Sequence, residues 1–561
     1  MQLFAFILYF VIVLAIGLWF FFRTKTGGDK EYFLGGRSTG PWVTAMSAQA
    51  SDMSGWLLMG FPGSILAFGL GQVWIGIGLA LGTIANWVLV ARRLRRFSEA
   101  SGDSITLPQY LTNRFATANP ALKITCAVIF LISFTIYVAS AFNAGAAVFV
   151  AVLPALKGYE MLAMAIFAVI VLVYTFLGGY KAVCWTDFFQ GLMMLCALLI
   201  VPIAIAVLMA LQGRVDADLV GSFGFLTSAP AEILEKLGFV GENAEKLYAE
   251  FVNGSSPELL EVFYTSKGLT AAEIDSLRVS AFQTNPFTTG FADIVSGLGW
   301  GLGYFGMPHI LVRFMGIKDS KMVKKSALVA CIWVVLTLGA AALIAILART
   351  FLLGDGIGLA EKLLPASAKQ NVFIEIVQDI FPGFVAGLLL AAIIAASMST
   401  ADSQLLVASS SFTSDLYQPL IRKNKASEKE TLWAGRIVVV IVTVIAFAIA
   451  ASGIGKADSW ASNIMAMVEN AWGLFGAAFG PAVVLSLFWR RFNYAGALAG
   501  ILAGAIVDLV WLFALTGPTG IYEIVPGAIV GAIAAVVTTL VTKAPSDEVL
   551  AIYDAATAVE E

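Results

Sequence analysis

Long apolar stretches recur along the whole chain, and they predict a bundle of membrane-spanning helices. A helix needs about 20 mostly apolar residues to cross the hydrocarbon core of a bilayer, and about thirteen stretches qualify as candidates. They are centred near residues 12, 52, 79, 138, 168, 198, 302, 338, 392, 445, 473, 505 and 531. The pattern therefore predicts an all-α polytopic membrane protein.

Basic residues between the stretches predict how the chain is oriented, because cytoplasmic loops carry an excess of lysine and arginine. If the N-terminus lies outside, the inner loops hold the cluster from Arg92 to Arg96, Arg313 with the lysines that follow it, and Arg490-Arg491. Most of the 34 lysine and arginine residues then lie inside. A count of twelve spans would leave some of these clusters outside, so we expect an outer N-terminus and an inner C-terminus.

Composition agrees with this class and argues against others. The 561 residues are 59% hydrophobic and 13% charged, with a mean hydropathy of +0.87, whereas soluble domains carry about 25% charged residues. The net charge of −3 argues against a nucleic-acid partner. The four cysteines form no Cys-x-x-Cys pair, which indicates neither a zinc site nor a disulfide framework. The start of the chain lacks a basic region and a cleavage site, so we expect a first span rather than a signal peptide.

One long segment outside the predicted spans, 212–289, is acidic and contains helical patches at Ala231–Leu237 and Ala271–Val279. We interpret it as an extracellular insertion whose short helices form a solvated cap, because charged stretches usually face water. The alternative is a lid or a docking face for a partner.

The second span breaks its own apolar pattern at Ala50-Ser51-Asp52-Met53-Ser54-Gly55. An ionisable residue at the centre of a bilayer costs roughly 2.5–3.5 kcal/mol, and it usually marks the path of an ion or a substrate. Asp52 is therefore the first candidate functional residue.

The seventh span is interrupted as well. Gly297, Gly299, Gly301 and Gly303 stand at every second position, and Pro308 follows; each glycine disfavours a helix by about 1 kcal/mol relative to alanine. Paired interruptions at matching positions predict two inverted repeats of five spans, with a binding site at the breaks. The alternative is that the glycines only allow close helix packing. Within a single transporter domain, 1–561, we expect a first repeat at 41–211, the insertion at 212–289, a second repeat at 290–488, and peripheral helices with a short cytoplasmic tail at 489–561.

A third polar patch lies in the ninth span. The hydroxyls of Ser399 and Thr400 and the carbonyl of Ala396 can face one neighbouring helix. A hard cation prefers several oxygen ligands, and an unwound helix frees carbonyls such as those of Ala50 and Met53. The alternative is helix–helix hydrogen bonding.

Together these runs resemble the sodium/solute symporter family over nearly the whole chain except 212–289. The matching runs are Gly35-Gly36-Arg37-Ser38, 50–60, Trp185-Thr186-Asp187, 299–306 and Met398-Ser399-Thr400. The resemblance implies a five-plus-five inverted repeat with extra helices in the plasma or inner membrane. It also implies sodium-coupled uptake of a small solute, with L-proline as the expected solute, and no enzymatic activity.

The family resemblance also implies individual roles. The implied sodium ligands are the carbonyls of Ala50, Met53 and Ala396 and the hydroxyls of Ser399 and Thr400. The implied substrate site consists of Ser54, Gly55, Trp56, Tyr137, Trp300, Tyr304 and Pro308. Asp52 would support sodium binding and coupling, and Arg37 and Asp187 would lie toward the inner gate or the ion exit.

The chemistry of proline fits this list of residues. Its carboxylate suits the exposed N–H groups and the cation at a broken helix, and its ring suits an aromatic wall. Trp300 and Tyr304 are four residues apart and share a helix face, and Tyr137 brings a hydroxyl from a third span. The alternative for each aromatic residue is ordinary packing or an interface belt.

Three residues require separate interpretations. Met307 stands where proline carriers of the family have a glutamine. Asp402 forms either a second cation site with Asp187 or a cytoplasm-facing salt bridge, and we favour the salt bridge. The only histidine, His309, is interpreted as packed or hydrogen-bonded rather than as a proton-coupling group.

Other functions are also compatible with the pattern. The solute can be another amino acid, a monocarboxylate, pantothenate or a sugar, and a transporter-like sensor is a more distant alternative. No phosphate-binding loop with Lys-Ser/Thr is present, so ATP is not expected to drive transport. The sequence predicts neither the number of sodium ions nor an oligomeric state.

Overall fold

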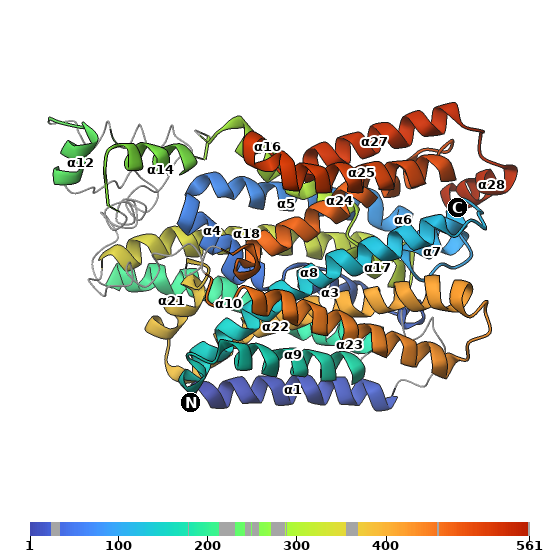
Figure 1. Ribbon diagram of the computed structural model, residues 1–561. Coiled ribbons are helices and arrows are strands. Elements are labelled where there is room, and N and C mark those ends of the chain that lie inside the picture. The colour runs from blue at the N-terminus through green and yellow to red at the C-terminus, as the bar shows by residue number, and fades with distance from the viewer. Residues whose placement is uncertain are drawn as a thin grey trace.

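The chain folds into a bundle of helices that run side by side (Figure 1). The structure is a computed structural model that describes residues 1–23, 34–177, 179–211, 231–241, 248, 257–270, 286–287, 289–354, 369–456 and 459–558. Within these ranges the regular elements are helices, and the β pairing is limited to an isolated bridge between Thr39 and Ile317. The all-α prediction is therefore confirmed.

Ten helices among the described residues are long and apolar enough to cross a membrane. They lie on α1 (Gln2–Arg23), α5 (Val73–Ala85) continued by η4 (Asn86–Ala91) and α6 (Arg92–Ala100), α8 (Ala121–Val152), α10 (Tyr180–Leu211), α18 (Val323–Gly354), α22 (Gly383–Ser410) continued by η9 (Ser411–Ile421), α23 (Glu428–Ser452), α24 (Ile464–Phe488), α25 (Tyr494–Ala514) and α27 (Ile524–Val541).

The three other predicted centres fall on shorter elements. One is α9 (Glu160–Leu177), an apolar helix somewhat below the length of the others. The other two are helices that break in the middle, namely α3 (Pro41–Asp52) with η2 (Trp56–Gly60) and α4 (Phe61–Phe68), and α16 (Phe291–Gly299) with η7 (Trp300–Phe305) and α17 (Pro308–Gly316).

The first break lies where the sequence predicts it. α3 ends at Asp52, and Met53 has φ −89° and ψ 85°, which is outside the helical region. The second break is displaced from the glycine run, which was expected to be irregular. The run is helical through α16 and the tighter 3₁₀ turns of η7, and the chain leaves the helix only at Met307, with φ −73° and ψ 107°. Pro308 then starts α17, where its missing N–H costs nothing.

The glycines of the seventh span serve close packing as well. A Cβ on Gly301 would collide with the carbonyl oxygen of Gly78 in α5, and a Cβ on Gly303 would collide with the ring of Trp472 in α24. The seventh span can therefore lie against α5 and α24 at a distance that only glycine permits.

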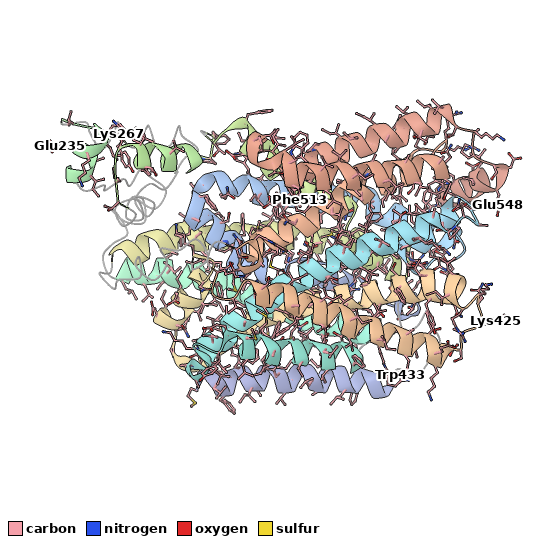
Figure 2. The ribbon with its side chains drawn as sticks, viewed as in Figure 1. Glu235, Lys267, Lys425, Trp433, Phe513 and Glu548 are labelled. Atoms are coloured by element: carbon pink, nitrogen blue, oxygen red, sulfur yellow. The ribbon has the colours of Figure 1, made fainter. Side chains whose placement is uncertain are left out.

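The two ends of the bundle differ. The N-terminus lies at the same end as α12 (Ala231–Leu237) and α14 (Pro257–Ser266), and the C-terminal helix α28 (Asp547–Thr557) lies at the opposite end (Figure 1). We call these the N-terminal end and the C-terminal end. Figure 2 shows Glu235 and Lys267 at the first end and Lys425 and Glu548 at the second.

Small elements close the two ends of the bundle. At the C-terminal end, α28 is joined by η1 (Gly35–Arg37), η8 (Ser320–Met322) and α7 (Leu107–Arg114). Toward the N-terminal end lie η5 (Pro154–Leu156), α21 (Val372–Ile380), η10 (Trp460–Ser462) and α26 (Thr516–Thr519). The 3₁₀ turn η3 (Leu70–Gln72) links α4 to α5.

Part of the acidic segment is described. The helix predicted at Ala231–Leu237 is confirmed as α12, and a small apolar cluster forms around it in which the hydroxyls of Tyr248 and Tyr264 lie 2.8 Å apart. The patch predicted at Ala271–Val279 lies outside the described residues.

Candidate functional site

The two broken helices meet at Asp52. The hydroxyl of Tyr304 in η7 donates a hydrogen bond of 2.7 Å to Asp52 Oδ2. The backbone carbonyl of Asp52 accepts from the Tyr137 hydroxyl at 3.3 Å and from Trp56 Nε1 at 3.2 Å. All four side chains are buried, and Asp52 Oδ1 has no hydrogen-bond partner. Asp52 therefore connects α3, η2, η7 and α8 at the centre of the bundle.

Oxygen atoms from α3 and α22 gather on the other side of the break. The Ser399 hydroxyl lies 2.7 Å from the carbonyl oxygen of Ala50 and 3.0 Å from that of Ala396. The hydroxyl of Thr400 is buried and has no hydrogen-bond partner. Met53 follows the last residue of α3, so its carbonyl lies where the helical hydrogen-bond ladder stops.

This set of atoms fits a small hard cation. Such a cation prefers oxygen ligands, and the set supplies hydroxyl and carbonyl oxygens without any soft ligand. An unpartnered buried hydroxyl at Thr400 is costly unless something binds it. Among the described residues, the structure shows no group of three acidic, histidine or cysteine side chains suited to a metal ion, so a cation here would depend on neutral oxygens.

An aromatic wall lies beside Asp52. Trp300 and Tyr304 are both buried, and the ring of Trp472 in α24 lies 5.0 Å from the ring of Tyr304. Trp472 Nε1 also donates to the carbonyl of Trp300 at 2.7 Å. Trp472 is not among the residues expected from the sequence, because an isolated tryptophan in an apolar helix carries no signal of its own.

Ser54 and Gly55 lie in the first break, between α3 and η2. A Cβ on Gly55 would lie 2.6 Å from the Cβ of Ala144 and 2.9 Å from the Ser397 hydroxyl, so only glycine fits at this position. Ser54 is buried, and its hydroxyl accepts from the backbone N–H of Trp56 at 3.4 Å.

Asp187 lies in a second polar cluster, apart from Asp52. Arg313 Nη2 lies 3.3 Å from Asp187 Oδ2, and both side chains are fully buried. The Ser47 hydroxyl donates to the same carboxylate oxygen at 2.6 Å and accepts from Arg313 Nε at 2.8 Å. Arg313 also donates to the Ser403 hydroxyl at 2.5 Å.

Arg313 corrects one expectation from the sequence. It was counted with the basic residues of an inner loop, but it lies inside α17 and is buried against the ring of Tyr180. Asp402 is buried nearby, and neither of its carboxylate oxygens has a hydrogen-bond partner. The ion pair that the structure shows for Asp187 is therefore made with Arg313.

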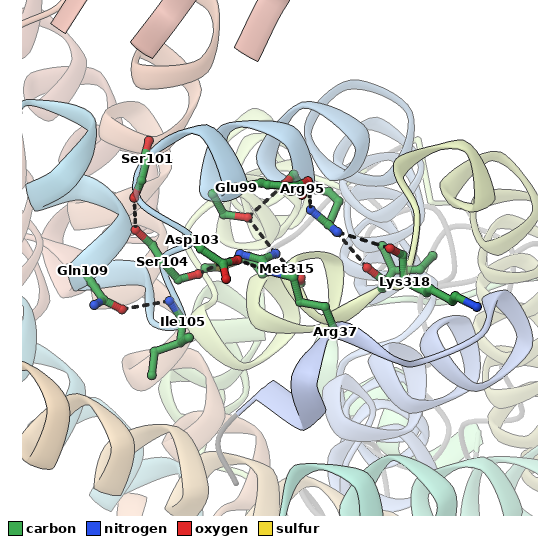
Figure 3. A network of polar contacts seen from close by, with 12 residues as sticks. Arg37, Arg95, Glu99, Ser101, Asp103, Ser104, Ile105, Gln109, Met315 and Lys318 are labelled. Carbon is green, nitrogen blue, oxygen red and sulfur yellow. Dashed lines mark hydrogen bonds and ion pairs between the residues drawn. The ribbon is translucent and has the colours of Figure 1, made fainter. Parts of the chain in front are cut away.

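Arg37 closes the C-terminal end of the bundle (Figure 3). Its guanidinium donates to Asp103 Oδ1 at 2.7 Å, to the carbonyl of Met315 at 2.5 Å, to the Ser98 hydroxyl at 3.1 Å and to the carbonyl of Ser104 at 3.0 Å. These bonds tie η1 to α6, to the loop between α6 and α7, and to the end of α17. The backbone of Arg37 has a φ of +53°, a strained conformation that surrounding contacts must hold.

Arg95 makes parallel contacts beside Arg37. It donates to the carbonyls of Ile317 at 2.7 Å and Lys318 at 3.2 Å and pairs with Glu99 at 2.6 Å. The two arginines thus hold this end together through bonds to backbone carbonyls. These bonds can form only when α6 and the end of α17 lie in a particular arrangement.

A cavity of about 850 Å³ opens at the N-terminal end. It is lined by parts of α8, α9 and α21 and by the connection between α23 and α24. Gln370 lines it and spans its floor, where its amide donates to the carbonyl of Ser462 at 3.2 Å and accepts from the N–H of Ile464 at 3.2 Å. Asn143 donates to the carbonyl of Ala461 at 2.6 Å. These hydrogen bonds hold α8, the segment just before α21 and the connection between α23 and α24 together at the cavity.

The remaining candidate residues lie near the centre. Met307 and Pro308 are buried at the second break. The ring of His309 packs against Phe134 at 5.7 Å and Tyr137 at 6.3 Å.

Comparison with known proteins adds to this geometry. The model of the sodium:solute symporter family matches residues 32–504. The sodium/proline symporter of Escherichia coli (strain K12) is 39% identical over 525 residues, which cover 93% of this chain and 90% of that protein. The sodium/proline symporter 2 of Staphylococcus saprophyticus is 39% identical over 550 residues, covering 96% and 92%.

Two further comparisons cover nearly the whole chain. The osmoregulated proline transporter of Bacillus subtilis is 37% identical over 541 residues, covering 96% of this chain and 94% of that protein. Among solved structures, a substrate-bound, outward-open state of a Na⁺-coupled sialic acid symporter aligns with a TM-score of 0.67 at 18% identity, covering 97% of this chain and 98% of that one. This last similarity shows a shared fold.

Proposed function

Because the chain belongs to the sodium:solute symporter family, we propose that it imports L-proline together with sodium across the cell membrane. The observation that carries this proposal is identity of 37–39% to three proline transporters along 93–96% of the chain. No covalent chemistry is needed, and we infer a transporter rather than an enzyme. One charge moving across 100 mV contributes about 2.3 kcal/mol to uptake.

The oxygen cluster between α3 and α22 is the proposed sodium site. Its ligands are the carbonyls of Ala50, Met53 and Ala396 and the hydroxyls of Ser399 and Thr400. The bonds from Ser399 to two of these carbonyls and the unpartnered hydroxyl of Thr400 support this assignment.

The space between the first break and the aromatic wall is the proposed proline site. The proposed lining residues are Ser54, Gly55, Trp56, Tyr137, Trp300, Tyr304 and Pro308. The proline carboxylate would face free N–H groups of the broken helix and the sodium ion, and its ring would face the aromatic wall. Asp52 would couple the two sites, because its carboxylate accepts from Tyr304 while its helix carries the sodium ligands.

Two closed ends support transport by alternating access. We infer that the C-terminal end faces the cytoplasm, so Arg37 closes the inner gate and the contacts of Gln370 and Asn143 close the outer one. Asp187 and Asp402 would lie on the inner side, toward the ion exit. The salt bridge expected for Asp402 is not among the ion pairs of the described residues; Arg313 pairs with Asp187 instead, and both Asp402 oxygens lack a hydrogen-bond partner. A second cation site that uses Asp402 with Asp187 therefore stays a proposal.

We further propose about thirteen spans with the N-terminus outside, arranged as two inverted five-span repeats at 41–211 and 290–488, with the insertion at 212–289 and peripheral helices at 489–561. Termini at opposite ends of the bundle support an odd number of crossings (Figure 1). Each repeat begins with a broken helix, as expected for this architecture.

Uptake into proteoliposomes tests the proposal. We expect uptake of radiolabelled L-proline that needs an inward sodium gradient and is lost when choline replaces sodium. Competition by unlabelled amino acids, a monocarboxylate, pantothenate and sugars identifies the solute, and stronger competition by another compound would reject proline. Uptake that is independent of sodium would reject the coupling, and binding without uptake would favour a sensor.

A further inference from the structure

Three carboxyl groups that the proposed transport site does not use meet behind its aromatic wall. They are Glu469 in α24, Asp508 in α25 and Glu523 directly before α27. Asp508 is fully buried, and Glu523 is 2% exposed. A Cβ on Gly473 would lie 3.1 Å from Asp508 Oδ1 and 3.4 Å from Glu523 Cγ, so the two side chains border the same position of α24.

Neither of these two carboxyls is paired with a cation. Both oxygens of Asp508 and Oε1 of Glu523 are buried without a hydrogen-bond partner, and Glu523 Oε2 accepts only a long bond of 3.3 Å from the Thr516 hydroxyl. Within the part of the chain that the structure describes, no ion pair involves Glu469, Asp508 or Glu523.

The described elements packed around these carboxyls supply no positive charge. α24 brings Glu469, whose backbone carbonyl accepts from the Tyr522 hydroxyl at 2.7 Å, and α26 carries no titratable side chain. α8 brings Tyr137 and η7 brings Tyr304, and both hydroxyls are bonded to Asp52. Asp293 of α16 lies exposed at the end of its helix.

Glycines at the crossing make room for the Asp508 carboxyl. A Cβ on Gly527 in α27 would lie 3.2 Å from the Cβ of Asp508, and the Gly473 position in α24 is equally tight. The close crossing of α24, α25 and α27 thus encloses an acidic side chain where an apolar residue would pack without cost.

Two unpaired carboxylates cannot both remain charged there. Burying one anion costs several kcal/mol even after relaxation, and a second like charge in contact adds to that cost. A proton bound to one carboxyl removes one negative charge. It also supplies an O–H donor for a carboxyl oxygen that has no hydrogen-bond partner. Groups coupled this closely titrate as a pair.

We propose that Asp508 and Glu523 share one bound proton, in a site distinct from the sodium site. The proton comes from water and leaves to water, and no covalent bond other than O–H changes. The position of this proton has a consequence for proline transport, and that consequence rests on the proposed function. Tyr522, next to Glu523, packs against Trp300 with ring centres 5.3 Å apart, and the ring of Trp300 lies 6.3 Å from that of Trp472, so loss of the proton would disturb the wall of the proline site.

Infrared difference spectroscopy on the purified full-length protein in lipid, after a step to alkaline pH, tests the proposal without measuring transport. We expect loss of a protonated-carboxyl band in the wild type and absence of this change in Asp508→Asn and in Glu523→Gln. Asp379→Asn, an exposed carboxyl on α21, is the matched control and should keep it. If Asp508→Asn fails to fold, Glu523→Gln still tests the shared proton.

Thermal unfolding against pH gives an independent measurement. An unfolded chain releases carboxyl protons at about pH 4, whereas the proposed folded pair still holds one at neutral pH. The wild-type melting temperature should therefore fall as pH rises from about 4 until the folded pair itself releases the proton. The two variants should lose most of this slope and the control should keep it. An equal slope in all proteins, or an infrared change that persists in both variants, would overturn the proposal. Stabilisation by sodium or potassium at constant pH that requires Asp508 would also overturn it, in favour of a metal-cation site.

Discussion

At the residue scale, Asp52 is the residue that we propose couples the sodium and proline sites without itself binding the solute. Its side chain accepts from Tyr304, and its carbonyl accepts from Tyr137 and Trp56. The sequence predicted the importance of Asp52 from its position in an apolar span. The partner of its side chain lies 252 residues away, and only the folded chain brings the two together.

Tyr304→Phe should weaken the coupling through Asp52. The change removes the hydrogen bond to Oδ2 and leaves a buried carboxylate with a lost donor, which costs about 1–3 kcal/mol. We expect the apparent affinity for proline in sodium to fall by about tenfold or more. Tyr110→Phe is the control, because the Tyr110 hydroxyl is also buried but bonds the Ser486 hydroxyl at 2.8 Å, outside the proposed proline site. Equal proline affinities for Tyr304→Phe and the wild type would contradict the role of Asp52.

Ser399→Ala should raise the sodium concentration needed for half-maximal uptake. The hydroxyl is a proposed ligand and also holds the carbonyls of Ala50 and Ala396. We expect an increase of about tenfold, from the loss of about 1.4 kcal/mol of binding free energy. Ser410→Ala is the control, because that hydroxyl bonds the carbonyl of Val407 within its own helix. An unchanged sodium dependence of proline uptake in Ser399→Ala would remove Ser399 from the site.

At the element scale, close packing and end contacts position the two broken helices. The glycine run of the seventh span predicted irregular backbone, whereas the structure shows a tight helix against α5 and α24. Both a break and close packing are thus present, at neighbouring positions. From the sequence alone, a helix break and close helix packing are alternatives, because glycine favours both.

Gly82→Ala should destabilise the bundle. The added Cβ would lie 2.5 Å from the Cα of Gly301, and two backbones cannot give way without separating α5 from η7. We expect a clear fall in melting temperature or in the yield of folded protein, measured in detergent by fluorescence size-exclusion chromatography. Gly339→Ala meets nothing within 4 Å, and it should be neutral or stabilising by up to about 1 kcal/mol. Equal behaviour of the two variants would contradict the packing argument.

Arg37→Lys should loosen the C-terminal end. A lysine keeps the charge but cannot reproduce the fork that reaches Asp103, Ser98 and two carbonyls. Hydrogen bonds to charged groups contribute about 1.5–3 kcal/mol each, so amide exchange in α6 and α7 should accelerate by tenfold or more.

Arg490→Lys is the control for this exchange experiment. Its ion pair with Asp554 lies exposed on the surface, where water and salt screen the two charges, so the pair adds little to stability. The pair lowers the pKa of Asp554 through the hydrogen bond and charge of Arg490. Similar exchange rates in Arg37→Lys and the wild type would show that Arg37 does not close the gate.

At the scale of the whole molecule, a cavity of about 850 Å³ opens at the N-terminal end, and the hydrogen bonds of Arg37 and Arg95 hold the elements of the C-terminal end together. The flanks of the bundle carry exposed apolar side chains such as Trp433 and Phe513, which are labelled in Figure 2. Apolar flanks and polar ends are the surface expected of a multi-pass membrane protein.

The proposed orientation predicts which end faces the medium. A cysteine in place of Asp379 on α21 should react with a membrane-impermeant maleimide in intact cells, and a cysteine in place of Asp547 on α28 only after permeabilisation. The unsubstituted chain, which has its own exposed Cys196, gives the background labelling. The opposite pattern of labelling would reverse the assigned topology.

The sequence by itself determined the class, the centres of the spans and the first break. These depend on local properties, namely apolar length, helix propensity and the cost of a charge in hydrocarbon. Tertiary structure decided the place of Arg313, which looked like a loop cation but pairs with Asp187 across 126 positions. It also placed Trp472 on the aromatic wall and Asp508 beside Glu523. Such contacts join residues far apart in the chain, and no local pattern encodes which distant side chain will occupy the adjoining space.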